Sequence, residues 1–184
     1  RQNPLAIQPA NAKGATAVTA LFDDTPGVER AIEIAVAQGY EIDDVNVVMS
    51  EDTRRRLYAD DRVQHSEITR KAAEGGELGG PTGGRVGIAI SIAAAVGAAL
   101  VLPGLGVVVA GPMTAALAAG GAAGIAAGLI GAAAHWGLPE NRLREYEAEI
   151  GKGRILIGLQ ARSASDARQI ASRWQSIGGL QVHS

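Results

Sequence analysis

The feature that most constrains this chain is a long stretch without charge. No Asp, Glu, Lys or Arg occurs between Val86 and Pro139, although charged residues make up 20% of the whole chain. Such a run cannot stay exposed to water, because a contiguous apolar surface of this size has to be covered by lipid or by protein. We therefore expect residues 86–137 to be buried in a membrane, in an assembly of several chains, or in both.

Proline and glycine divide this stretch into two predicted helical arms. Helix should break at residues 103–106 (PGLG) and again at residues 111–112 (GP), because proline cannot continue a helix and glycine weakens one. Residues 86–102 would form a helix about 26 Å long, and residues 113–136 would be long enough to cross a bilayer. The sequence thus predicts a helical hairpin that turns at Pro103, Gly104, Gly106, Gly111 and Pro112.

Small residues recur every four positions along both predicted arms. This spacing places them on one face of a helix, so that a second backbone can approach closely and make dense van der Waals contact. The first arm is rich in Val, Ile and Leu and could enter lipid alone, whereas the second is diluted by glycine and needs a partner. This glycine zipper predicts a homo-oligomer. The expected helix-packing positions are Gly87, Ser91, Ala95, Ala116, Gly120, Gly124, Gly128 and Ala132.

The residues that flank the stretch predict that both of its ends lie on the cytoplasmic side of a membrane. Arg85 precedes it and Arg142 follows it, as expected for cytoplasmic ends. Both arginines and Trp136 are candidate contacts for lipid headgroups, although Trp136 could equally pack on a soluble domain. The predicted tip, residues 107–110 (VVVA), is apolar, which favours a re-entrant or deeply buried hairpin as much as a full span.

The segments on either side of the stretch predict two halves of one domain. Residues 16–50 read as strand, helix and strand, and residues 138–184 read as helix, strand, helix and strand. The helices at the centre of the two halves share the apolar spacing i, i+3, i+4, i+7. We therefore expect an α+β fold in which residues 16–50 and 138–184 form one split ferredoxin-like domain, with four strands backed by two helices.

The remaining segments are predicted to connect or to extend this domain. Residues 1–15 contain no apolar run of the kind found in a signal peptide and are expected to form a flexible tail. Residues 51–85 are expected to form a connector that is first charged and then rich in glycine. Its three arginines, at 54–56, could contact anionic lipid, but a solvated helix start is the simpler interpretation because two aspartates follow.

No pattern in the sequence predicts an enzyme. The chain has no cysteine, and its histidines, His65, His135 and His183, lack the spacing of metal ligands. The glycine-rich residues 75–84 lack the GK[ST] ending of a phosphate-binding loop. Asp23 and Asp24 are typical of a helix N-cap. We expect no catalytic residue, cofactor or metal, and the net charge of −2 predicts no nucleic-acid partner.

Taken in order, several segments resemble the bacterial general-stress-protein family that is called YflT-like. The resemblance is carried by residues 18–49, the Gly/Ala-rich stretch with LPGLG at 102–106, GLPE at 137–140, YE at 146–147 and GRILI at 153–157. It covers nearly the whole chain after the tail, and the charged connector is where this chain departs most. The resemblance implies a bacterial, stress-associated and membrane-associated protein, and it brings no catalytic residues with it.

Three functional hypotheses follow. The first is a non-enzymatic assembly protein whose apolar hairpin enters or lies on the cytoplasmic membrane and packs into a homo-oligomer, with the domain in the cytoplasm. The second is a soluble ring or shell whose hairpins are buried at its centre. The third is a regulatory module that binds a small ligand. The sequence does not indicate a protein partner other than further copies of the same chain.

Overall fold

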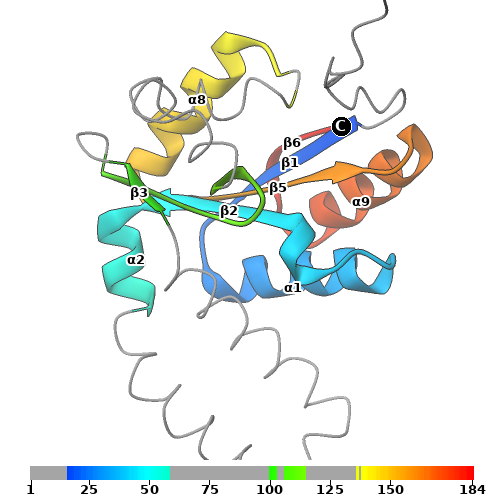
Figure 1. Ribbon diagram of the computed structural model, residues 1–184, viewed down its shortest axis with the longest axis horizontal. Coiled ribbons are helices and arrows are strands. Elements are labelled where there is room, and N and C mark those ends of the chain that lie inside the picture. The colour runs from blue at the N-terminus through cyan, green and yellow to red at the C-terminus, as the bar shows by residue number, and fades with distance from the viewer. Residues whose placement is uncertain (1–15, 59–99, 103–105, 115–135, 137) are drawn as a thin grey trace, which may run out of the picture.

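The computed structural model describes residues 16–58, 100–102, 106–114, 136 and 138–184, which form an α+β fold (Figure 1). The strands are β1 (Thr16–Phe22), β2 (Val45–Ser50), β3 (Leu100–Leu102), β4 (Val107–Ala110), β5 (Ile155–Ala161) and β6 (Leu180–His183). The helices are α1 (Thr25–Ala37), the 3₁₀ turn η1 (Ile42–Asp44), α2 (Glu51–Tyr58), α8 (Glu140–Gly151) and α9 (Ala164–Ser176).

The strands form one six-stranded sheet in the order β3-β4-β2-β5-β1-β6. Every neighbouring pair in it is antiparallel. The segments on either side of the apolar stretch are joined in this sheet, because β1 pairs with β5 from Thr16 opposite Ala161 to Phe22 opposite Ile155. Residues 16–50 and 138–184 therefore share one sheet.

Local sequence signals explain where α1 and α9 begin. Asp24 caps α1 by accepting a hydrogen bond of 2.8 Å from the amide of Gly27, and Pro26 lies in the first turn, where its missing N–H costs nothing. Ser163 caps α9 in the same way, accepting from the amide of Asp166 at 3.1 Å. Both helices are followed by a glycine with positive φ, Gly39 and Gly178, as the sequence predicts.

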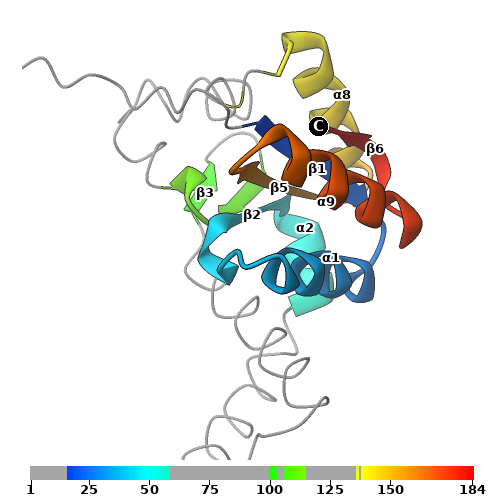
Figure 2. The ribbon, with the colours of Figure 1, turned by 90° about the vertical axis from the view of Figure 1, so that its right-hand side faces the viewer.

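One face of the sheet is covered by α1 and α9, which lie side by side in both views (Figures 1 and 2). The alternate residues Val18, Ala20 and Phe22 of β1 point to this face and are at most 2% exposed. Trp174 of α9 is completely buried, and its indole N–H donates to the carbonyl of Ala31 in α1 at 2.9 Å. This first core is the one that the periodicity of the two helices predicts.

The other face of the sheet is covered by α8 and by residues from the middle and the C-terminal end of the apolar stretch. Leu143, Tyr146 and Ile150 of α8 pack on Leu21 and Leu156. Met113, Trp136 and Leu138 belong to the same cluster. We call this second apolar cluster the anchoring face; it consists of Ala17, Leu21, Val48, Val107, Val109, Met113, Trp136, Leu138, Leu143, Tyr146, Ile150 and Leu156.

The structure corrects the prediction for the middle of the apolar stretch. Residues 100–102, expected at the end of a helical arm, form β3, and the expected tip at residues 107–110 forms β4. Strand β4 pairs with β2, from Val47 opposite Ala110 to Ser50 opposite Val107, and it is at most 9% exposed. These valines are thus covered by the protein's own sheet, because a short apolar run that lacks helical periodicity fits a buried strand as well as a helix.

The boundary of the connector is also corrected. Residues 51–58 were expected to belong to a segment outside the domain, but they form α2, which contacts β2 and β4. The amide of Glu51 donates to the carbonyl of Gly106 at 2.7 Å, and Leu57 packs against the core beneath α1. The domain therefore includes α2, β3 and β4. The rest of the predicted connector and the predicted tail lie outside the described residues.

A cluster of charges joins the end of α8 to the start of α1. The guanidinium of Arg154 donates to Asp23 at 2.7 Å and to Glu149, and Lys152 donates to the other carboxylate oxygen of Glu149 at 2.7 Å. Glu149 is only 9% exposed. The hydrogen bond from Lys152, followed by the charge of Arg154, lowers the pKa of Glu149 despite its partial burial.

This lowered pKa predicts how stability depends on pH. A depressed carboxyl pKa stabilises the folded state fully above the ordinary value, near 4.5, and the contribution is lost as the pH falls through the folded-state pKa. We expect Glu149→Gln to remove that part of the pH dependence in urea unfolding between pH 6 and pH 3. Glu147→Gln, two residues away on the same helix, is the control. Parallel pH profiles for Glu149→Gln and the unchanged protein would contradict this assignment.

Candidate functional site

The described residues that bear most directly on function are those that hold the apolar stretch on the anchoring face. Asn46 is the second residue of β2, is 3% exposed, and points to this face. Its carboxamide oxygen accepts a hydrogen bond of 2.7 Å from the amide of Met113, and its NH₂ group donates to the carbonyl of Gly158 at 3.4 Å. Both halves of this buried amide are therefore used, which stabilises its burial.

A sharp turn brings the chain from β4 to Asn46. Gly111 has φ +101°, and a Cβ at this position would lie 2.4 Å from the carbonyl oxygen of Val45. Only glycine allows the backbone to pass so close to β2 in this conformation. The hydroxyl and the amide of Thr114 then bond the carbonyl of Gly111 at 2.7 and 3.0 Å, and a helical turn begins at Met113. Met113 is completely buried.

Trp136 lies at the other end of the segment that begins at Met113. Its indole ring lies directly over Gly158 in β5, where an added Cβ would be 2.5 Å from the ring carbon Cη2. The residue is 5% exposed. Gly158 thus forms a notch in the sheet that only the absence of a side chain keeps open for this ring, as is common where another group approaches a strand closely.

Tyr146 of α8 completes the anchoring face near β1. It is completely buried, and its hydroxyl lies 2.8 Å from that of Thr19 and 3.2 Å from the carbonyl of Gln181 in β6. Because the phenol has one hydrogen, it donates to the carbonyl and accepts from Thr19. Burial, more than any charge, raises the pKa of Tyr146, so this hydroxyl stays neutral and serves as a structural link between α8, β1 and β6.

The two ends of residues 113–136 therefore meet on one face of the sheet. Met113 bonds Asn46, Asn46 bonds Gly158, and Gly158 contacts Trp136. The residues between these two ends, 115–135, lie outside the described part of the chain, so the helical arm expected over 113–136 stays a prediction.

The structure places five of the residues that the sequence singled out. Gly106 lies in the turn between β3 and β4 with φ +60°, and Gly111 and Pro112 lie where β4 ends, so all three do interrupt regular structure. They turn a strand, however, and not a helical hairpin. Trp136 packs on the domain, which is the alternative to a headgroup contact. Arg142 is paired weakly with Glu145, at 3.9 Å.

The other singled-out residues lie outside the described part of the chain. They are the eight expected helix-packing positions Gly87, Ser91, Ala95, Ala116, Gly120, Gly124, Gly128 and Ala132, the turn residues Pro103 and Gly104, and Arg85. Within the ranges that the structure describes, no helix has both the length and the apolar character needed to cross a membrane.

Sequence reasoning missed the two residues on which the site depends. Asn46 is a polar residue inside the buried strand VNVV, and Gly158 interrupts the strand ILIGLQ. Each is a recognisable signal, because a buried polar group needs a partner and a glycine inside a strand indicates close approach of another group. Neither signal identifies the partner, which in both cases comes from more than 20 residues away in the chain (67 for Asn46 and Met113).

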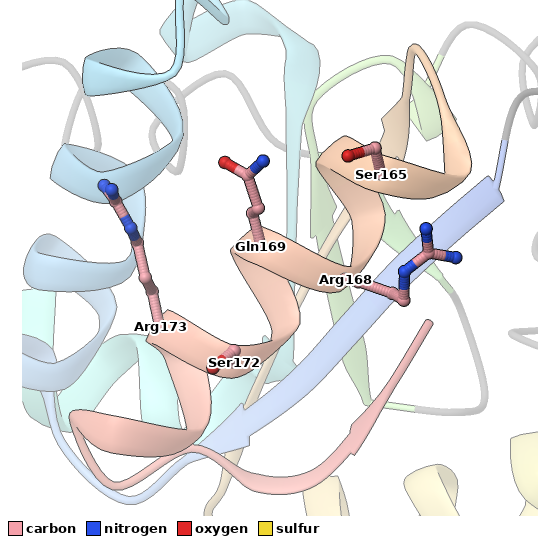
Figure 3. Close-up of a pocket in the computed structure, with 5 residues that line it drawn as sticks. All are labelled: Ser165, Arg168, Gln169, Ser172 and Arg173. Carbon is pink, nitrogen blue, oxygen red and sulfur yellow. The ribbon is translucent and has the colours of Figure 1, made fainter.

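A second candidate site is a shallow polar groove on the outer side of α9. It has a volume of about 350 Å³ and is lined by Ser165, Arg168, Gln169, Ser172 and Arg173 (Figure 3). All five residues are exposed. Among the described residues no group of His, Asp and Glu side chains is arranged to hold a metal ion.

Comparison with known proteins adds no assignment to either site. No protein-family model, no curated protein and no solved structure matches this chain.

The fit of Trp136 over Gly158 predicts a large effect from a small substitution. Gly158→Ala should lower the free energy of unfolding by about 1–3 kcal/mol, because a methyl group would overlap the rigid indole ring. Gly151→Ala is the matched control, since no atom lies within 4 Å of a Cβ built there. Urea unfolding of the full chain measures both, and equal stabilities of the two variants would contradict the notch.

Proposed function

We propose that this chain is a non-enzymatic assembly protein in which the apolar residues of 86–137 pack against the same residues of other copies, on or in the cytoplasmic membrane. Two observations together support the proposal. The chain contains a long uncharged stretch in which no catalytic or ligand-binding pattern is found, and the anchoring face holds Met113 and Trp136 of that stretch together on one face of the domain.

The domain itself supports a ferredoxin-like assignment within this proposal. Strands β2, β5, β1 and β6 are adjacent in that order, and each half of the chain contributes a strand, a helix and a strand. Both helices, α1 and α9, cover the same face. This strand order and the placement of both helices on one face support a split βαβ fold that is extended at one edge by β4 and β3. Because of this extension, Met113, the first residue of the segment 113–136, lies next to β2.

The geometry of the ends favours attachment from one side of a membrane over two full crossings. Since β3 takes Leu100–Leu102, only residues 86–99 remain for the first predicted arm, and these would make a helix about 21 Å long. The hydrocarbon core of a bilayer is about 30 Å thick, so this arm is too short to cross it. Residues whose two ends return to one sheet face suit an embedded or surface-lying segment.

A soluble assembly is the second candidate, and the position of Trp136 favours it. A tryptophan that anchors a protein at the lipid interface keeps its ring among the headgroups, whereas this ring is 5% exposed and lies against Gly158. In this version the apolar segments of several copies cover one another, and none of them contacts lipid. The family resemblance supports an association with stress in both versions, whereas the membrane association that it also implies favours the first.

Fractionation of cells without detergent separates the two candidates. The leading proposal predicts that the protein sediments with membranes, stays there in high salt because apolar contact is not screened, and is released by detergent. The second candidate predicts a large particle in the soluble fraction. A monomer in the soluble fraction would contradict both.

Assembly through the small-residue face is tested by Gly124→Leu. A leucine there should keep two helices from approaching closely and should reduce the particle size measured by native mass spectrometry. Ala126→Leu is the matched control, because two residues along a helix turn a side chain to nearly the opposite face. An unchanged particle in Gly124→Leu would count against the small-residue face as the contact.

A further inference from the structure

The groove on α9 is a positively charged surface that has no counter-charge of its own. Arg168 and Arg173 are the charged residues among its five lining residues, and no carboxylate lines it. In the described part of the chain neither arginine forms an ion pair. Both side chains are exposed, so their charge is available to a partner.

The arrangement of the two arginines indicates the size of that partner. Figure 3 shows their side chains directed to opposite sides of α9, with Gln169 and Ser165 between them. Two guanidinium groups that diverge cannot close on one small anion. A broader acidic surface can contact both, and the short neutral side chains between them allow it to approach the helix.

The same chain presents an acidic surface of this kind. Residues 41–44 (EIDD) carry three carboxylates in four positions, and Glu41, Asp43 and Asp44 are all exposed. The turn has a defined shape, because the amide of Glu41 donates to the carboxylate of Asp44 at 2.9 Å. Within the described residues, Asp43 forms no ion pair or side-chain hydrogen bond. We call residues 41–44 the acidic turn.

The groove and the acidic turn lie next to each other but are not paired within the chain. Tyr40 immediately precedes the turn, and its hydroxyl donates to Asp166 of α9 at 3.2 Å and accepts from the amide of Arg162 at 2.9 Å. The guanidinium of Arg162 also lies 4.3 Å from the centre of the Tyr40 ring. These contacts fix the turn beside the beginning of α9, one residue from where the groove begins at Ser165.

We propose that the acidic turn of one copy docks in the α9 groove of a second copy, and that the contact is reciprocal. Two complementary patches that lie side by side on one chain satisfy each other twice across a two-fold axis placed between them. The groove of each protomer then receives the turn of its partner. Val36 lies near the end of α1, five residues before the acidic turn, and its 39% exposed side chain adds an apolar group at the edge of the contact.

This contact goes beyond the assembly proposed above, because it lies in the helix layer on the face of the sheet opposite the anchoring face. It does not require the apolar segment. It would dimerise the domains on the water side, whichever of the two candidate assemblies the apolar segment forms.

Disulfide trapping tests the proposal cleanly because the chain contains no native cysteine. Full-length Asp43→Cys and Gln169→Cys chains carrying different mass tags are mixed and oxidised gently. We expect the mixed disulfide in clear excess over its statistical share relative to the two homodimers. Asp43→Cys mixed with Ala148→Cys, an exposed position on α8 behind the sheet, is the control and should give no excess.

The charges are tested in the same assay. Arg173→Glu in the Gln169→Cys chain should slow formation of the mixed disulfide by about tenfold at low salt, since it replaces attraction by repulsion at an exposed site, and salt should reduce the difference. The excess should persist when both chains carry Gly124→Leu, which separates this contact from the apolar one. Far-UV circular dichroism and thermal unfolding confirm that each variant folds.

Three results would overturn the proposal. One is a mixed disulfide at its statistical share in folded chains, and another is a rate that Arg173→Glu does not change. The third is saturable perturbation of the Arg168 and Arg173 side-chain NMR signals by inorganic phosphate together with no excess of mixed disulfide. That last result would assign the groove to a small anion.

Discussion

A single buried amide, Asn46, connects the parts of this structure that the chain separates. It bonds the backbone of Met113 on one side and the backbone of Gly158 on the other, so it ties the beginning of an apolar segment to the central strand pair β2 and β5. The ring of Trp136 packs over the same Gly158, so Trp136 is held at the same place on the sheet. Without these contacts, Met113 and Trp136 would no longer cover the sheet face beneath α8. The two ends of residues 113–136 would then not be held close together.

This constraint shapes the functional interpretation more than the composition of the apolar stretch does. A stretch without charge is compatible with a pair of membrane-crossing helices, and the bilayer thickness alone would allow the second of them. The anchoring face changes that picture, because Met113 and Trp136 meet there and because β3 shortens the first arm. The described residues show a domain whose anchoring face holds Met113 and Trp136, while α1 and α9 cover the opposite face of the sheet and α9 carries the groove with Arg168 and Arg173.

The sequence predicted the parts of the fold that depend on short-range patterns. Alternation in β1, the apolar spacing of α1 and α9, and the cap at Asp24 are set by neighbours within about one or two turns of chain, and all were expected correctly. The strands at 100–102 and 107–110 were missed because, in an uncharged run, strand and helix bury equally well and periodicity cannot separate them. The sequence PGLG at 103–106, between two short apolar runs, is typical of the turn of a β-hairpin. The roles of Asn46 and Gly158 depend on partners distant in sequence, which local patterns cannot supply.

The most direct test of the account is whether Met113 and Trp136 share one binding place on the sheet. Nuclear Overhauser measurements on the isotope-labelled full chain, in water or in detergent micelles, can observe both contacts at once. The account predicts cross-peaks from the Trp136 ring to the Hα protons of Gly158 and from the Met113 amide to the Asn46 carboxamide. Cross-peaks from the Trp136 ring to detergent chains, with none to Gly158, would contradict it.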